Sequence, residues 1–261
     1  MPFRDSAGLR YYSFANLARV GVAHGVFTRL GGSSPQPWDS LNVGSMVGDD
    51  PQRVAAHLGL AAEAIGLPRT GLVVARQVHG DRIHPVDHVP PRNESIPEAD
   101  GLVTAQVGIA LAMKFADCVP ILLFDPIQRV AGIAHAGWRG TVQGVAVLAV
   151  KTMQARYGVR PADLLAGIGP SICAEHYRVG DEVVAAARDA LGDAAESAII
   201  PMADGLHLDL WAANRILLER AGVRDIEVAG ECTAGDTAHW FSHRAEAGRT
   251  GRFAAMIGLA P

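Results

Sequence analysis

The chain has 261 residues, of which 49% are hydrophobic and 19% are charged. Such a composition can bury a sizeable core, which excludes global intrinsic disorder. The net charge is −4, so the chain lacks the basic excess typical of nucleic-acid-binding proteins. Its three cysteines, Cys118, Cys173 and Cys232, are odd in number and widely spaced, which excludes the disulfide framework of a small secreted domain.

No apolar run reaches the roughly 18 residues that a membrane-spanning helix needs. Residues 1–12 carry Arg4, Asp5 and Arg10 in place of the apolar segment of a signal peptide. We therefore expect a cytoplasmic protein that binds neither nucleic acid nor a membrane. No stretch has the composition of an interdomain linker, so we expect a single domain over residues 1–261, present as a monomer.

Helical and strand-like segments follow one another along the chain. Asp50 before Pro51 predicts a helix that starts at residue 51, and Gly66 ends it. Further helices are predicted at 141–157, 182–191 and 210–221, and strands at 71–79, 100–105, 109–115, 119–124, 130–134, 164–168, 226–229, 239–242 and 253–259. Hairpins mixed with helical crossovers predict an α+β protein with a mixed or antiparallel sheet, and not a Rossmann-type fold.

One predicted hairpin brings a cysteine and a histidine together. Its turn is expected at 125–128, where Pro126 suits the second position of a type I turn. With this turn and no bulge, Cys118 and His135 lie directly opposite each other, with Cβ atoms about 5 Å apart. A thiolate and an imidazole at this separation can share one metal ion.

A third metal ligand has to come from another strand end. His79 follows a predicted strand and is the first candidate. His84 and His88 are alternatives, but Pro85 between them breaks any helix that would align their side chains. Three protein ligands leave a fourth position open, as in catalytic zinc sites, where zinc lowers the pKa of a bound water to about 7.

Short motifs carry these three residues and recur in order along the chain. They are LNVG at 41–44, GDDP at 48–51, RQVHG at 76–80, ADG at 99–101, ADCVP at 116–120, AHAGWRG at 134–140, GIGP at 167–170, CT at 232–233, SHR at 242–244 and TGR at 250–252. In this combination the chain resembles the YfiH family. Members of this family are also described as laccase-domain or polyphenol oxidase proteins and as peptidoglycan editing factors.

The resemblance implies an α+β fold with sheets flanked by helices and a zinc ion bound by His79, Cys118 and His135, which would form the catalytic centre. It also implies a purine nucleoside phosphorylase that acts on adenosine, inosine, guanosine and methylthioadenosine, with adenosine deaminase activity. Nucleoside and phosphate are then the small-molecule partners.

Substrate and phosphate contacts are expected from three further residues. Arg139 stands at the start of the helix predicted after the hairpin, where backbone N–H groups also favour anions. Asn42 lies in the LNVG motif, and Arg244 belongs to a late basic cluster. Two positions depart from the family pattern: His57-Leu58 replace the usual Asn-Arg, and His243 replaces a frequent Tyr.

Three alternatives remain open at this point. Two histidines and a cysteine also form blue-copper sites, which would fit a copper-dependent polyphenol oxidase, although the ten histidines include no His-x-His pair. Cys118 beside His135 can instead form the nucleophile pair of a metal-free hydrolase. The third alternative is a peptidoglycan-editing protein. Asp117 is not expected to act as a base, because neighbouring strand residues face opposite ways, and Cys173 and Cys232 are expected in the core or a pocket wall.

Overall fold

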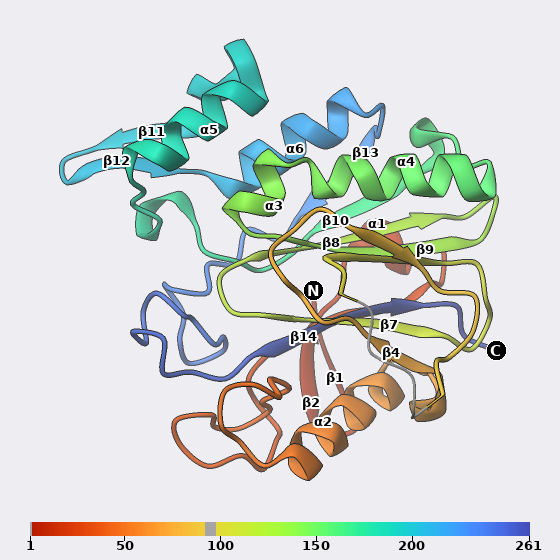
Figure 1. Ribbon diagram of the computed structural model, residues 1–261. Coiled ribbons are helices and arrows are strands. Elements are labelled where there is room, and N and C mark those ends of the chain that lie inside the picture. The colour runs from red at the N-terminus through yellow and green to blue at the C-terminus, as the bar shows by residue number, and fades with distance from the viewer. Residues whose placement is uncertain (1, 92–97) are drawn as a thin grey trace.

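Two six-stranded sheets stack face to face in the computed structural model, which describes residues 2–91 and 98–261 (Figure 1). The first sheet has the order β1 (Phe3–Ser6), β2 (Leu9–Tyr12), β3 (Ala23–Phe27), β14 (Phe253–Gly258), β7 (Ala110–Phe115) and β4 (Leu72–Val74). The second has the order β13 (Asp225–Val228), β10 (Leu165–Ile168), β8 (Val119–Asp125), β9 (Val130–Ala136), β6 (Gly101–Thr104) and β5 (Ile83–Pro85). Antiparallel pairs predominate, while β4–β7, β5–β6 and β10–β13 are parallel, which confirms the predicted α+β fold with mixed sheets.

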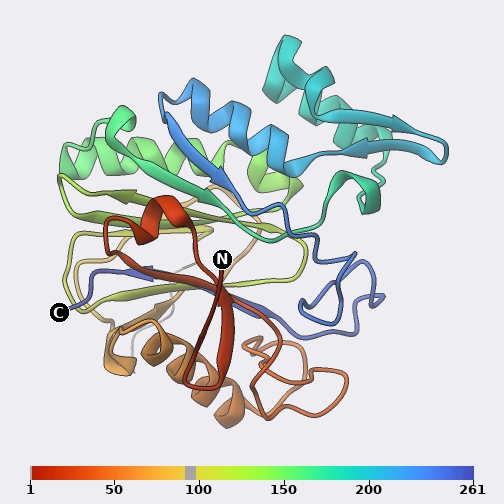
Figure 2. The ribbon, with the colours of Figure 1, turned by 180° about the vertical axis from the view of Figure 1, so that it is seen from behind.

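Helices cover the outer faces of both sheets. On the first sheet lies α2 (Pro51–Ala64), and on the second lie α4 (Val145–Tyr157) and α6 (Leu210–Arg220) (Figure 1). The remaining α-helices and strands are α1 (Ala15–Ala18), α3 (Trp138–Val142), α5 (Asp181–Leu191) and the hairpin of β11 (Ile199–Met202) and β12 (Gly205–Leu208). Seen from behind, β1 and β2 form the near edge of the first sheet (Figure 2). Within the described residues, no helix combines the length and apolar character that crossing a bilayer requires.

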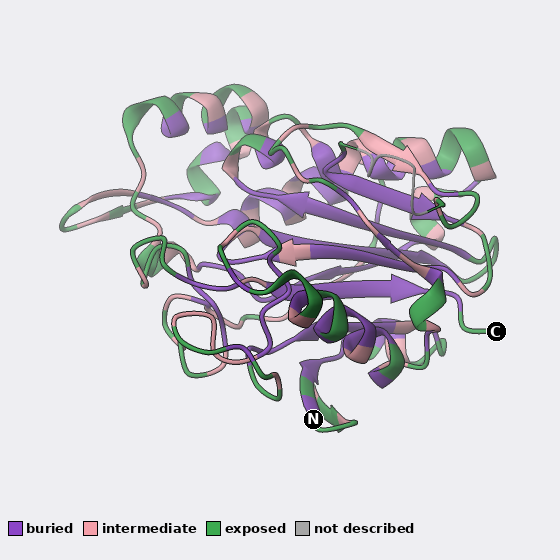
Figure 3. Cartoon of the chain, turned by 60° about the horizontal axis from the view of Figure 1, so that its bottom comes forward, coloured by how far each residue is buried: buried purple, intermediate pink, exposed green. Residues whose placement is uncertain are grey.

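The central strands are buried on both faces, as the colouring of Figure 3 shows. Leu111, Met113 and Phe115 of β7 point between the two sheets, whereas Ala110 and Ala112 face the core under α2. This alternation is the period-two pattern that predicted the strand at 109–115. Small residues on the α2 side leave room for the helix.

Side-chain caps start two of the helices where the sequence predicts them. The carboxylate of Asp50 accepts a hydrogen bond from the backbone N–H of Gln52 at 2.8 Å, and that of Asp209 accepts one from Ala212 at 2.9 Å. These bonds satisfy N–H groups that have no partner within the helix. The first turns of α2 and α6 are therefore fixed by local sequence.

Other expectations fail locally. The helix predicted at 141–157 is divided into α3 and α4, because Gly144 adopts a left-handed φ of 75° between them. The segment 239–242, predicted as a strand, contains a turn residue and a bend and forms no strand, and the strand predicted at 71–79 is limited to β4. Helix α1 and six strands, namely β1, β2, β3, β5, β11 and β12, lie outside the predicted elements.

The register of the β8–β9 hairpin also differs from the prediction. Asp125 pairs with Val130, and its carboxylate accepts hydrogen bonds from the N–H groups of Ile127 and Gln128 inside a longer turn. Pro120, and not Cys118, therefore lies opposite His135, so the predicted direct pairing is wrong. The observed register differs from the predicted one by two residues. Because side chains alternate between the two faces of a strand, Cys118 and His135 remain on the same face, in diagonal positions.

We expect the layer between the sheets to dominate stability. The side chain of Leu111 is 0% exposed, so Leu111→Ala should lower the free energy of unfolding by about 2–5 kcal/mol through lost burial and a residual cavity. Ile127→Ala is the control, because Ile127 lies in the hairpin turn and is 62% exposed, and its effect should stay within about 0.5 kcal/mol. Urea unfolding of both variants provides the measurement. Equal losses for the two variants would contradict this account of the core.

Candidate active site

The chain crosses from the first sheet to the second between β7 and β8, and the candidate site forms at this crossing (Figure 1). Cys118 directly precedes β8, His135 is the second-last residue of β9, and His79 lies in the loop that follows β4. The Cys118 sulfur and one ring nitrogen from each histidine all lie within 4.8 Å of one another. The structure thus brings together the three residues predicted as metal ligands.

The backbone around this cluster adopts conformations that the cluster requires. His79 has φ 60° and Asp117 has φ 81°, both in the left-handed region that non-glycine residues seldom occupy. Gly137 faces Cys118, and a Cβ atom on it would lie 2.8 Å from the sulfur. Glycine at this position leaves the space that the thiol occupies.

A buried carboxylate, Asp100, holds the ring of His135 and the backbone of the loop that carries His79. Its Oδ1 accepts a hydrogen bond from His135 Nδ1 at 2.8 Å and one from the His79 N–H at 3.1 Å. Its Oδ2 accepts bonds from the N–H groups of Val78 at 3.1 Å and Gly80 at 2.8 Å. With Nδ1 held in this way, His135 presents Nε2 to the cluster, which is the usual arrangement of a metal-ligating histidine. The ADG motif contains Asp100, but the sequence alone assigned it no role.

Charge coupling within the cluster shifts two pKa values strongly. Burial raises the pKa of Cys118, but the charge and hydrogen bonds of His135 and His79 outweigh it and bring the pKa to about 6. Burial lowers the pKa of His135, but the Cys118 thiolate and Asp100 outweigh it and bring the pKa to about 9. The two histidines therefore favour the thiolate of Cys118, the form in which cysteine binds metals and attacks electrophiles.

The donor set fits a thiophilic metal ion. One thiolate and two imidazoles suit zinc or copper, whereas magnesium and calcium prefer oxygen ligands. The hydrogen bond from His135 to Asp100 supplies the outer partner that raises the basicity of a ligating histidine.

A cavity of about 580 Å³ opens directly onto the cluster. This volume lies within the range of small-molecule sites. Five cationic side chains line it, namely Arg76, Lys114, Arg139, Arg244 and Arg252. Lys114 was not predicted to line the cavity, because it reaches this site only through the position of β7 in the folded sheet. This concentration of positive charge suits an anionic ligand.

The two arginines predicted to bind phosphate both line this cavity, and they differ in how they are held. Arg139 lies over the ring of Trp138 at 4.3 Å, and the hydrogen bonds and ion pairs among the described residues include none from its guanidinium. Arg244 donates to the backbone carbonyls of His176 and Arg178 and lies 5.1 Å from the ring centre of Tyr177. Arg139 is the second residue of α3, and this helix has only five residues, so the positive charge at the cavity comes mainly from the side chains.

Asn42, also predicted at the substrate, does not line the cavity. Its buried amide donates to Asp49 at 2.9 Å and accepts from the N–H groups of Gly44 and Arg252. His57 is similarly buried and donates from Nδ1 to the Asn42 carbonyl at 2.8 Å. Both side chains hold the loop before α2 in place.

Asp117 anchors the C-terminal loops to the site. Its buried carboxylate accepts hydrogen bonds from Thr233 Oγ1 and Ser242 Oγ, both at 2.7 Å, and from the Arg244 N–H at 2.6 Å. These three bonds engage both oxygens of the carboxylate, and Asp117 also lines the cavity. They also bring Arg244 to the cavity wall.

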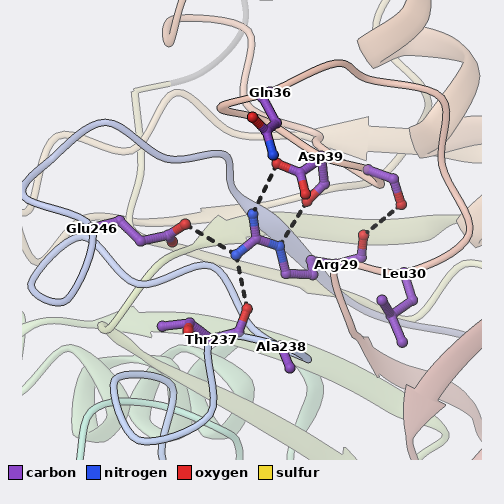
Figure 4. Close-up of a pocket in the computed structure, with 8 residues that line it drawn as sticks. Arg29, Leu30, Gln36, Asp39, Thr237, Ala238 and Glu246 are labelled. Atoms are coloured by element: carbon purple, nitrogen blue, oxygen red, sulfur yellow. Dashed lines mark hydrogen bonds and ion pairs between the residues drawn. The ribbon is translucent and has the colours of Figure 1, made fainter.

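A second hollow, of about 350 Å³, surrounds Arg29 (Figure 4). The Arg29 guanidinium donates to the Asp39 and Thr237 carbonyls at 2.7 and 2.9 Å and pairs with Glu246 at 3.0 Å. Because its donors are used within the chain, Arg29 acts as a clamp between the loop after β3 and the C-terminal loops.

Comparison with known proteins agrees with the sequence motifs. The family described as "Multi-copper polyphenol oxidoreductase laccase" matches residues 23–260. The purine nucleoside phosphorylase of Deinococcus radiodurans is 41% identical over 253 residues, which cover 97% of this chain and 94% of that protein. The purine nucleoside phosphorylase YlmD of Geobacillus stearothermophilus is 39% identical over 248 residues, covering 92% of this chain and 90% of that protein.

Solved structures show the same fold over the full length. The crystal structure of Geobacillus stearothermophilus YlmD superposes with a TM-score of 0.92 at 37% identity and covers 100% of this chain and 99% of that one. YfiH of Bacillus licheniformis superposes with a TM-score of 0.90 at 36% identity, with 99% of both chains covered. The chain therefore belongs to the multi-copper polyphenol oxidoreductase laccase family, which includes the YfiH proteins that its motifs resemble.

Proposed function

We propose that this protein is a zinc-dependent purine nucleoside phosphorylase. The observation that carries the proposal is the cluster of His79, Cys118 and His135 at the floor of a cavity lined by five cationic side chains. Relatives at about 40% identity are named purine nucleoside phosphorylases. The family description mentions multiple coppers, but the chain has no His-x-His pair of the kind that multicopper clusters use.

Different residues of the cavity have different roles in the proposed phosphorolysis. His79, Cys118 and His135 hold the zinc ion, and Asp100 keeps the His135 ring in its ligating orientation. When bound, zinc supplies a Lewis acid that stabilises negative charge on a departing group or acidifies water.

Arg139 is the proposed phosphate-binding residue, and Arg244 and Arg252 line the same cavity. The Arg139 donors have no partner among the described residues, and packing on Trp138 limits the directions in which the guanidinium points. The aromatic faces of Trp138 and Tyr177 suit a purine ring. The cavity thus holds phosphate beside the nucleoside, so that a phosphate oxygen attacks the sugar carbon as its bond to the base breaks.

The same cavity suits adenosine deamination, in which water replaces the amino group at the six-position of the purine ring and releases ammonia. Zinc deaminases perform this reaction. Adenosine, inosine, guanosine and methylthioadenosine are the proposed phosphorolysis substrates, and adenosine is the deamination substrate.

A second candidate follows from the thiolate state of Cys118. With a pKa of about 6 and two histidines beside it, Cys118 has the properties of a nucleophile in a metal-free hydrolase. The two functions differ in their response to chelators, because only the phosphorylase loses activity when zinc is removed.

Product analysis tests the proposed function directly. Incubation of inosine with phosphate should release hypoxanthine and ribose 1-phosphate, and omission of phosphate should abolish this release. Adenosine should yield inosine whether or not phosphate is present, because water is the only co-substrate. A strong chelator should abolish both reactions, and zinc should restore them. Turnover that survives zinc removal would support the thiol candidate, and no product with any nucleoside would refute the proposed function.

Replacement of Arg139 tests the assignment of the phosphate site. Arg139→Ala should raise the KM for phosphate about tenfold or more, because hydrogen bonds to charged groups contribute about 1.5–3 kcal/mol, and should change the KM for inosine much less. Arg249→Ala is the matched control, since Arg249 is exposed and does not line the cavity. Steady-state kinetics with each substrate varied in turn gives both constants. An equal rise in the two KM values, or no rise, would show that Arg139 does not bind phosphate.

A further inference from the structure

A second group of metal-binding side chains lies outside the cavity. The sulfur atoms of Cys173 and Cys232 and a ring nitrogen of His176 all lie within 4.8 Å of one another. His176 Nδ1 is 3.2 Å from the Cys173 sulfur and 3.5 Å from the Cys232 sulfur. The two cysteines were expected in the core or a pocket wall, but the structure places them with this histidine, half-buried and next to solvent.

Backbone hydrogen bonds hold the two segments that supply these residues. The Thr233 N–H donates to the Ser171 carbonyl at 3.1 Å, and the Ser171 N–H donates to the Glu231 carbonyl at 3.1 Å. A short turn then brings His176 back toward Cys173, as the His176 N–H donates to the Cys173 carbonyl at 3.1 Å. The three donor atoms converge because the backbone places them, with no metal required to draw the segments together.

Both sulfur atoms lie within hydrogen-bond reach of His176 Nδ1, and the Cys232 sulfur also accepts a hydrogen bond from the Cys173 N–H at 3.3 Å. A neutral imidazole nitrogen has one lone pair, so Nδ1 can accept from only one of the two thiols. A disulfide between the two cysteines would leave the imidazole without either partner. One metal ion would bind all three donors at once through bonds of about 2.0–2.3 Å.

We propose that Cys173, His176 and Cys232 form a second metal site, which binds one zinc ion independently of the first cluster. Two thiolates and an imidazole are a common zinc donor set, and soft thiolate ligands disfavour magnesium and calcium. His176 is exposed, so water can occupy the fourth position. The site goes beyond the proposed phosphorylase function and does not depend on it.

The position of this second site gives it a structural role at the rim of the cavity. Tyr177, which lines the cavity, directly follows His176, and the His176 carbonyl accepts a hydrogen bond from Arg244. On the other segment, Thr233 follows Cys232 and donates to Asp117 beside the first cluster. A metal ion here would link the segment that carries Tyr177 in the cavity wall to the segment whose Thr233 bonds to Asp117.

Zinc binding by the full-length chain tests the proposal when the first cluster has been removed. Cys118→Ser eliminates that cluster and leaves both cysteines of the second. After zinc loading and dialysis against metal-free buffer under reducing conditions, this variant should retain one zinc per chain. Adding Cys232→Ser should lower retention to near zero, and adding His176→Ala should weaken binding at least tenfold. Adding His88→Ala, which removes an exposed histidine outside both clusters, should change nothing.

Cobalt provides an independent readout. The Cys118→Ser variant loaded with Co²⁺ should show thiolate-to-cobalt charge-transfer absorption in the near ultraviolet, and this absorption should vanish with Cys232→Ser. Circular dichroism and urea unfolding confirm that each variant is folded. A folded Cys118→Ser variant that binds no zinc, zinc retained without Cys232, or a stable Cys173–Cys232 disulfide in thiol titration would each overturn the proposal. Nucleoside turnover is not measured, so failure here leaves the proposed function standing.

Discussion

The Asp100 carboxylate is the interaction on which the geometry of the site depends. A buried charge is costly unless it is fully hydrogen-bonded, and Asp100 is 0% exposed. Burial raises its pKa, but His135 and the N–H groups of Gly80 and Val78 outweigh this effect, so the pKa is lowered and the carboxylate is charged. One side chain thereby fixes both the loop that carries His79 and the ring of His135.

A second buried carboxylate, Asp117, holds the C-terminal loops at the cavity. Its carboxylate binds the segments that carry Thr233, Ser242 and Arg244, which lie more than a hundred residues further along the chain. The crossing between the two sheets places Asp117 next to Cys118. The ligands and the cationic wall of the cavity are therefore positioned by two buried acids, and the strands supply the rigid frame between them.

Sequence patterns predicted the features that depend on local chemistry or short periods. The caps at Asp50 and Asp209 and the alternation in β7 are of this kind. The predicted register of the β8–β9 hairpin was wrong because the Asp125 side chain accepts hydrogen bonds within a longer turn. Residue spacing alone does not reveal such a turn. Asp100 and Lys114 joined the site only through pairings between distant segments, and the His176 cluster joins segments that are more than fifty residues apart.

The central claim is that His79, Cys118 and His135 bind one zinc ion, with His135 held by Asp100. Anomalous diffraction at the zinc absorption edge, from crystals of the zinc-loaded protein, tests it most directly. The account predicts an anomalous peak bonded to the Cys118 sulfur and to both histidines, with His135 coordinating through Nε2 while Nδ1 keeps its bond to Asp100. A zinc-loaded crystal with no peak between these three side chains would contradict it.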